Sequence, residues 1–219
     1  MAPPPANRWA RFALALEETA PGQPLCVSLC NTRHWRNSAA PKEVLTGYDK
    51  VVDWAVATAI CTPAEGERLA GEAAAHPHVA AAEWRRTLAL REAIAAVLAA
   101  HARHRAVPAD AQAEVDTAFR EAMAHLALSV ADRRLVPSVP DGREGLEAPR
   151  WQAALSAVAL LVSPARARVR ECADDRGCGW LFVDTTRNGS RRFCFGNECA
   201  NRARQARYRA RHRHAAHAG

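Results

Sequence analysis

The sequence predicts an α+β protein: a mainly α-helical N-terminal domain with a few short strands, followed by a small C-terminal module. Three observations lead to this fold class. Apolar side chains recur at helical spacing in several stretches of residues 49–162. Four of the seven cysteines fall within residues 172–199, and the excess positive charge lies after residue 186. We expect an N-terminal domain of residues 1–165, a module of residues 166–213 and a disordered tail of residues 214–219.

The first half of the N-terminal domain is expected to contain one strand and two helices. After a proline-rich start, residues 25–32 alternate larger apolar with smaller residues and predict a strand. Cys26 and Cys30 in this stretch are interpreted as core residues, because no third or fourth ligand lies close to them. Residues 49–60 have the apolar spacing of a helix. Thr62 to Glu65 form a capping box with proline at the first helical position, so a second helix begins there and ends near residue 76.

The second half of the domain is predicted to be helical apart from one hairpin. Helices are expected over 79–105, 109–125 and 149–162, the last ended by Ser163-Pro164. Residues 126–130 and 135–139 are short β-rich runs around a turn and predict a hairpin. Residues 164–170 join the two domains, and their three arginines extend the basic surface that follows.

The four clustered cysteines predict a zinc site. Cys172, Cys178, Cys194 and Cys199 are all soft ligands, and nothing in the chain indicates export to an oxidising compartment where they would form disulfides. Zinc prefers four thiolates in a tetrahedron, and a segment with too few apolar residues for a core can take its folding free energy from the metal. Four sulfur ligands leave no open position, so the expected site is structural rather than catalytic.

The spacing of these cysteines predicts a treble-clef-like module of loop, hairpin and helix. Residues 180–183 form a β-rich run, Asn188-Gly189 is a strong two-residue hairpin signal, and residues 191–194 are the expected returning strand. Cys199 then opens a predicted helix that lacks glycine and proline over residues 200–210. The positive end of the helix dipole favours a thiolate at this position.

This stretch closely resembles the CGNR zinc-finger family of bacterial transcription regulators. The residues that carry the resemblance are the four cysteines, the run from Gly179 to Phe193, and Ala200-Asn201-Arg202, where alanine replaces the signature glycine. In that family the finger follows an ABATE domain, described as a stress-induced transcription regulator, whose opening strand ends in Asn-Thr as at residues 31–32 here. The resemblance implies that the four cysteines bind Zn²⁺ and that the chain regulates transcription.

The distribution of charge favours a nucleic-acid partner. Residues 187–219 hold nine arginines and one acidic residue, whereas residues 1–186 hold 21 basic and 22 acidic residues, so the net charge of +7 lies entirely near the C-terminus. A solvated charged helix is the alternative, but the acidic partners that such helices carry at i±4 are missing. The candidate nucleic-acid-binding residues are Arg187, Arg191, Arg192, Asn201, Arg202, Arg204, Arg207, Arg209 and Arg211. Arg202 has a second interpretation, in which it serves the fold of the module.

Arg91 is the anomaly of the N-terminal domain, because it lies at the centre of the apolar face of the 79–105 helix. A buried guanidinium without a partner is costly, so it must reach solvent, pair with a carboxylate or bind an anion. Two interpretations stay open. Arg91 forms an internal ion pair, or it binds a small anionic effector in a sensor pocket with Asn31 and Thr32. The resemblance favours the second, because ABATE domains have a similar Leu-Arg-x-Ala helix.

Several other classes of function find no support in the sequence. No segment has the 18 or more apolar residues of a membrane span, and the N-terminus does not match a signal peptide, so a cytoplasmic protein with reduced thiols is expected. Phosphate-binding, dinucleotide-binding and hydrolase motifs are missing, which argues against an enzyme. The sequence therefore predicts a zinc-dependent regulator that binds duplex DNA, with an effector or a homodimer contact in its N-terminal domain. The alternative is an RNA- or ribosome-binding zinc protein, because arginine-rich helices also bind structured RNA.

Overall fold

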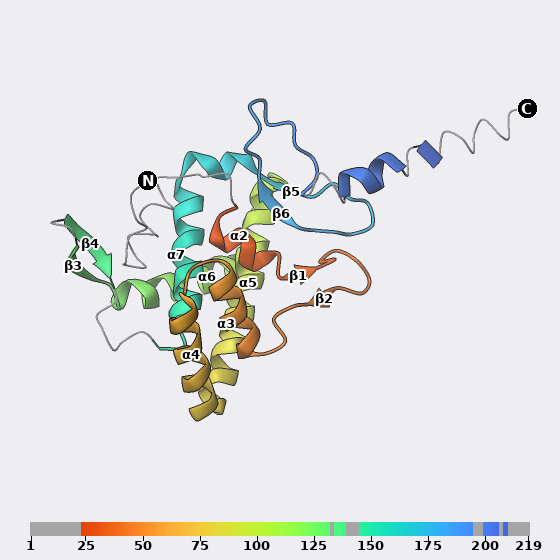
Figure 1. Ribbon diagram of the computed structural model, residues 1–219. Coiled ribbons are helices and arrows are strands. Elements are labelled where there is room, and N and C mark those ends of the chain that lie inside the picture. The colour runs from red at the N-terminus through yellow and green to blue at the C-terminus, as the bar shows by residue number, and fades with distance from the viewer. Residues whose placement is uncertain (1–22, 132–133, 139–144, 195–198, 206–207, 210–219) are drawn as a thin grey trace, which may run out of the picture.

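The structure is a computed structural model that describes residues 23–131, 134–138, 145–194, 199–205 and 208–209 (Figure 1). The helices are α2 (Leu25–Cys30), α3 (Tyr48–Ala57), α4 (Pro63–Ala75), α5 (Pro77–Ala102), α6 (Ala109–Ala124), α7 (Ala148–Val162) and the 3₁₀ helix η1 (Pro164–Arg168). The strands are β1 (Arg33–His34), β2 (Lys42–Glu43), β3 (Ala127–Ala131), β4 (Arg134–Ser138), β5 (Val169–Glu171) and β6 (Leu181–Val183). Residues 199–205 and 208–209 are helical and follow the last strand. The predicted α+β class is confirmed.

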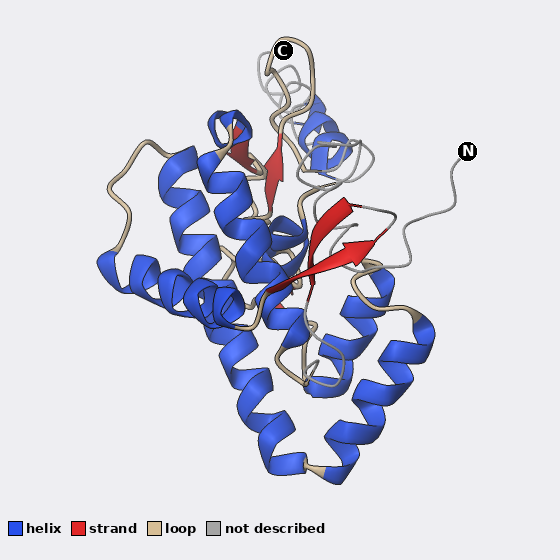
Figure 2. Ribbon diagram, turned by 90° about the vertical axis from the view of Figure 1, so that its left-hand side faces the viewer, coloured by secondary structure: helices blue, strands red, loops and turns tan. Residues whose placement is uncertain are grey.

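Helix α5 is the centre of the helical body. It contacts α2, α3, α4, α6, α7 and η1, and its C-terminal half also packs against β5 and β6. Side chains on almost every side of this half are buried, including those of Leu90, Ile94 and Leu98, because the other elements surround it. Helices make up most of the body, and the strands form only short ribbons (Figure 2).

Most helices lie where the apolar spacing predicts them. The Thr62 capping box is present: the Glu65 amide donates to the Thr62 hydroxyl at 3.3 Å, and the Thr62 amide donates to the Glu65 carboxylate at 2.7 Å. The predicted hairpin is also present as the antiparallel pair β3–β4. These elements depend on local sequence, which explains why the sequence alone predicts them.

The strand predicted at residues 25–32 is wrong, because this segment forms helix α2. Cys26, Val27, Leu29 and Cys30 are almost completely buried, since α2 packs against both α5 and α7. A short apolar run that is buried on most sides has no exposed face, so periodicity does not separate helix from strand. Cys26 and Cys30 are core residues, as expected.

The pairing predicted for residues 180–183 is also wrong. Strand β6 pairs with β5, which precedes the first clustered cysteine, and not with residues 191–194. A turn does form at this place, but it spans residues 186–189: the Gly189 amide donates to the Thr186 carbonyl at 3.2 Å, and Gly189 has a φ of 64°. Residues 191–194 return toward the cysteines without joining the ladder, although the Ala173 amide donates to the Arg192 carbonyl at 2.9 Å. The hairpin of the C-terminal module therefore consists of β5 and β6.

The β5–β6 ribbon is shared by two hydrophobic clusters. Val169, Leu181 and Val183 belong to the core that includes the helices. Phe182 points to the opposite face and packs with the four clustered cysteines, Trp180 and Phe193. All three residues of β6 are buried, because one face covers the helical body and the other covers the cysteine cluster.

The free edge of β6 is closed by two amide side chains from the N-terminal part of the chain. Asn31 accepts from the Leu181 amide at 3.0 Å and donates to the Leu181 carbonyl at 2.9 Å. Gln23 does the same at Val183, with distances of 2.6 and 3.4 Å. The two side chains replace a third strand, so the edge has no open hydrogen-bonding groups at these positions.

We predict that Leu181→Ala destabilises the helices as well as the ribbon. Leu181 is 2% exposed within the main core, and a Leu→Ala change at such a site costs about 2–5 kcal/mol. Thermal unfolding followed by far-ultraviolet circular dichroism measures the helices, which lie outside the ribbon. Val162→Ala is the control, because Val162 is 72% exposed. An unchanged melting temperature for Leu181→Ala would show that the helical core does not depend on β6.

Candidate metal centre and nucleic-acid interface

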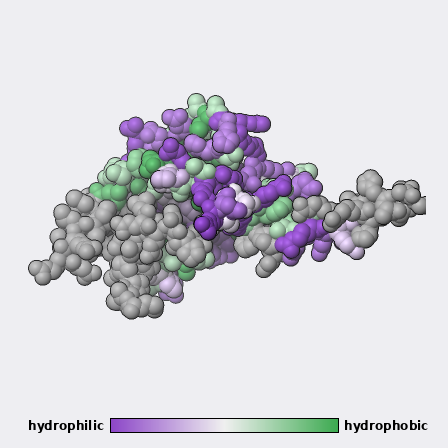
Figure 3. All heavy atoms as spheres, turned by 90° about the horizontal axis from the view of Figure 1, so that it is seen from above, coloured by the Kyte–Doolittle hydropathy of each residue, from purple (hydrophilic) through white to green (hydrophobic). Residues whose placement is uncertain are grey.

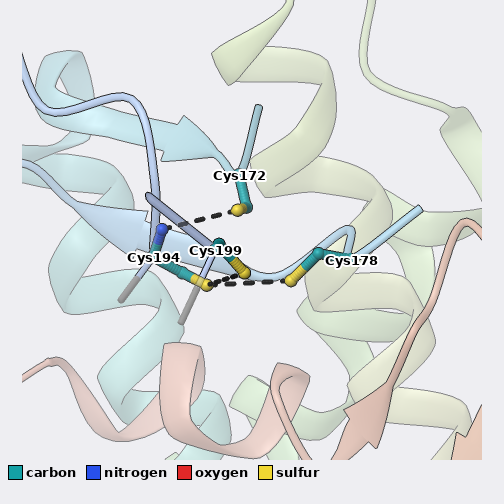
Figure 4. A group of neighbouring side chains, drawn as sticks. All are labelled: Cys172, Cys178, Cys194 and Cys199. Carbon is teal, nitrogen blue, oxygen red and sulfur yellow. Dashed lines mark hydrogen bonds between the residues drawn. The ribbon is translucent and has the colours of Figure 1, made fainter. Parts of the chain in front are cut away.

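Four cysteines converge at the outer face of the β5–β6 ribbon. Cys172 follows β5, Cys178 precedes β6, Cys194 ends the returning loop (residues 184–194) and Cys199 begins the C-terminal helix. All four are buried, and their sulfur atoms lie within 4.8 Å of one another. Figure 4 shows the four side chains pointing toward a common centre. The structure therefore brings together every cysteine of the predicted metal site.

The spacing of the sulfurs matches a tetrahedral zinc site. The Sγ atoms of Cys178 and Cys194 are 3.7 Å apart, as are those of Cys194 and Cys199. Four sulfurs at about 2.3 Å from one zinc ion are about 3.8 Å from each other. The donor set and its geometry therefore fit Zn²⁺, with these four cysteines as the residues that can hold it.

The sulfur atoms of this cluster are close enough to hydrogen-bond to one another, which shifts the pKa values of their thiols. Hydrogen bonds from Cys178 and Cys194 lower the pKa of Cys172 to about 2, whereas hydrogen bonds with Cys172 and Cys178, together with burial, raise the pKa of Cys194. Burial raises the pKa of Cys199 to about 12. Such closely packed sulfurs cannot all ionise on their own, so binding of a divalent cation must release protons.

Two buried aspartates, which the sequence reasoning did not single out, shape the loops that carry the cysteines. Asp184 accepts hydrogen bonds from the amide and hydroxyl of Thr186 and from the Arg191 amide, at 2.6–2.9 Å. Burial alone would raise the pKa of Asp184, but these hydrogen bonds hold it below its ordinary value. Asp174 accepts from the amide of Arg176 at 3.1 Å. An aspartate two residues before its amide donor is a turn signal that could have identified both.

Two of the candidate nucleic-acid-binding arginines, Arg191 and Arg202, bind groups within the C-terminal module. Arg202 donates to the Cys199 sulfur at 2.9 Å and to the Asp174 carboxylate at 3.3 Å. Arg191 donates to the carbonyls of Phe193 and Cys194, and its guanidinium lies 4.7 Å from the Phe182 ring centroid. These contacts give both arginines a role in holding the cysteine ligands.

The remaining candidates separate into exposed residues and residues outside the described part of the chain. Arg187 and Arg192 are exposed on the returning loop, and Asn201, Arg204 and Arg209 are exposed on the helix. Among the described residues, none of the four arginines in this group pairs with a carboxylate. Arg207 and Arg211 lie outside the described residues. The exposed set therefore carries positive charge that no described carboxylate neutralises.

Arg91 is 2% exposed and is bound by protein groups. Glu43 accepts from both of its terminal nitrogens at 2.6 Å, and Glu92 accepts from its Nε at 2.9 Å. Burial opposes ionisation of Glu43, but the hydrogen bonds from Arg91 outweigh it and lower the pKa of that carboxyl. The Thr32 hydroxyl accepts from Arg91 at 3.2 Å, whereas the Asn31 side chain is directed to β6. The internal ion pair is thus present, and an anionic effector at Arg91 stays a prediction.

Comparison with family models now identifies both parts of the chain. Residues 23–164 match the ABATE model, whose description is "Putative stress-induced transcription regulator", and residues 168–212 match the CGNR zinc finger. The ABATE match covers more than half of the chain. The chain belongs to the ABATE family. No curated protein matches this sequence closely enough to count as a relative.

These matches show an ABATE domain, from a family described as a transcription regulator, followed by a C-terminal CGNR zinc finger. The buried four-cysteine cluster of that finger is consistent with Zn²⁺ binding. Within the described residues, no helix of this ABATE protein has the length and apolar character needed to cross a membrane.

We predict that the purified ABATE protein carries one zinc ion per chain, with Zn–S distances of about 2.3 Å. Cys199→Ser should abolish zinc binding, because a serine hydroxyl is a poor replacement for a thiolate. Cys61→Ala is the matched control, since Cys61 is also buried but lies outside the cluster. Elemental analysis and X-ray absorption measure both quantities. Protein prepared without chelators that lacks zinc, or that shows an iron–sulfur absorption band, would contradict the assignment.

Proposed function

We propose that this ABATE protein regulates transcription by binding duplex DNA through its zinc finger, with Cys172, Cys178, Cys194 and Cys199 as the zinc ligands. The observation that carries the proposal is the helix that begins at Cys199. It extends away from the body, and hydrophilic side chains cover its described turns (Figures 1 and 3). A projecting helix with unneutralised arginines is suited to the major groove, where phosphates lie on both sides.

The positions of the arginines support contact with both strands. Arg204 is exposed on the helical residues 199–205, and Arg209 is exposed on the helical residues 208–209 farther along the chain. Arg187 and Arg192 add charge from the neighbouring returning loop. We assign phosphate contacts to these four residues and a base contact to Asn201, and we keep Arg207 and Arg211 as candidates that lie outside the described residues. Arg191 and Arg202 are assigned to the fold of the finger, on the basis of their contacts with the cysteine-bearing segments.

We also propose that the ABATE region supplies the regulatory input, as a sensor of a small molecule or as a dimer contact, in a cytoplasmic protein with reduced thiols. An anionic effector that used Arg91 and Thr32 would have to compete with Glu43. The carboxylate of Glu43 is one-third exposed, which gives an anion a route to the guanidinium. Such an effector would act close to Asn31, which holds the edge of β6.

We predict that Arg204→Glu/Arg209→Glu abolishes retention of duplex DNA in a gel-shift assay while zinc content is unchanged. For weaker charge removal, Arg204→Gln/Arg209→Gln should flatten the dependence of log affinity on log salt by about 0.9 for each phosphate that the variant no longer neutralises.

Arg85→Glu/Arg120→Glu is the matched control, because it makes the same charge change at exposed positions of the helical body. Unchanged DNA binding in the Arg204/Arg209 variant would exclude the helix as the contact element. Retention of structured RNA in preference to duplex DNA would favour the RNA-binding alternative.

A further inference from the structure

The C-terminal helix is attached to the rest of the protein through its first turn. Cys199 contributes its sulfur to the metal site, and Arg202 bonds to Asp174 and to the Cys199 sulfur. The helix then extends away from the body (Figure 1). At a rise of about 1.5 Å per residue, Arg204 is about 8 Å along the axis from Cys199. A small rotation of the first turn would therefore displace the exposed arginines farther along the helix by a larger distance than it displaces Cys199.

An aromatic residue from the ABATE region contacts this first turn. The Trp35 ring lies under the guanidinium of Arg202, with 5.0 Å between Cζ and the ring centroid. Tryptophan has the most favourable face for such a cation–π contact. Arg202 thus receives three contacts of different origin: a sulfur of the metal site, a buried carboxylate of the finger and a ring from the N-terminal region.

Trp35 adopts a backbone conformation that is unusual for its size. Its φ is 54°, in the left-handed region that bulky residues rarely occupy. Such a conformation costs free energy and persists only where the surroundings determine it. In this protein, hydrogen bonds made by the next two residues hold the conformation of Trp35. The Arg36 amide donates to the Cys178 carbonyl at 3.0 Å, and the Asn37 amide donates to the Gly177 carbonyl at 3.1 Å.

Residues 31–38, which we term the docking segment, fit closely against the first cysteine loop. Gly177 and Gly179 both have positive φ, and a Cβ atom on Gly177 would lie 2.7 Å from the Asn37 backbone. Beside this contact, the rings of His34 and Trp180 meet edge to face with centroids 5.1 Å apart. The docking segment is in turn fixed to α5 through the bond from Arg36 to Glu92, and to α2 through the bond from Arg36 to the Cys30 carbonyl. A continuous series of contacts therefore links α5 to the base of the C-terminal helix.

We propose that Trp35 is a positioning residue for the DNA-binding helix, and that the docking segment makes the ABATE region part of the DNA-binding unit. Trp35 sets the direction of the helix by holding Arg202 against the finger. The arginines farther along the helix then meet the phosphates in one fixed orientation. This inference rests on the proposed function in one respect, namely that the partner of the helix is duplex DNA.

The test compares Trp35→Gly with Trp35→Phe in the full chain. Glycine keeps the left-handed backbone without strain but removes the ring, whereas phenylalanine keeps an aromatic face. Three quantities are measured: zinc content, affinity for a fluorescently labelled duplex, and the heteronuclear ¹H–¹⁵N NOE of the Ala203 amide. The NOE measures the order of the helix and requires no DNA.

We expect Trp35→Gly to keep one zinc per chain, to bind the duplex about tenfold more weakly and to lower the Ala203 NOE. Trp35→Phe should restore most of the affinity and of the NOE. An unchanged NOE in Trp35→Gly would overturn the inference, and so would loss of zinc, because Trp35 would then serve the metal site.

Two further outcomes are distinguishable. If the native chain does not bind the duplex, the proposed function fails, while the NOE comparison still decides whether Trp35 orders the helix. If Trp35→Gly does not fold, Trp35→Leu replaces it, because leucine is bulky but has no π face. Equal NOE values for Trp35→Leu and Trp35→Phe would then contradict the proposal.

Discussion

Strand β6 is buried on both faces and along its free edge, and the arrangement of the whole protein depends on this burial. A ribbon of two three-residue strands is too small to be stable in water by itself. Leu181 and Val183 pack in the same core as the helices, while Phe182 packs against the four clustered cysteines. Asn31 and Gln23 then close the edge. Since each buried aliphatic or aromatic side chain contributes about 1.5–3 kcal/mol, the same strand stabilises both family modules.

The arginines of the protein divide according to whether carboxylates neutralise them. In the helical body, Arg91, Arg103 and Arg150 all pair with glutamates, and the Arg150–Glu83 pair is almost completely buried. In the described part of the finger, the exposed arginines of the returning loop and the helix lack such partners. Charge that is neutralised internally cannot attract a polyanion, so the unneutralised arginines of the finger are the ones available to a nucleic-acid partner.

Local sequence signals account for the features that were predicted correctly. Helical periodicity, the Thr62 capping box and the four clustered cysteines each act over a few residues, and burial of Arg91 follows from its place on one helix face. The failures are long-range. Helix α2 was predicted as a strand, because the burial of its side chains depends on α5 and α7. The partner of β6 was also predicted wrongly, because β6 pairs with β5, which precedes Cys172. The contact of Trp35 with Arg202 spans more than 160 residues, so no local pattern could indicate it.

The central claim is that the zinc finger and the ABATE helices share one core and unfold together. Differential scanning calorimetry of the full chain, with zinc bound and after its removal by a chelator, tests this most directly. Because zinc binds the folded state, its removal should lower the melting temperature of the helices together with that of the finger, as one cooperative transition. A helical transition that stays at the same temperature, beside a separate transition that disappears with the metal, would contradict the account.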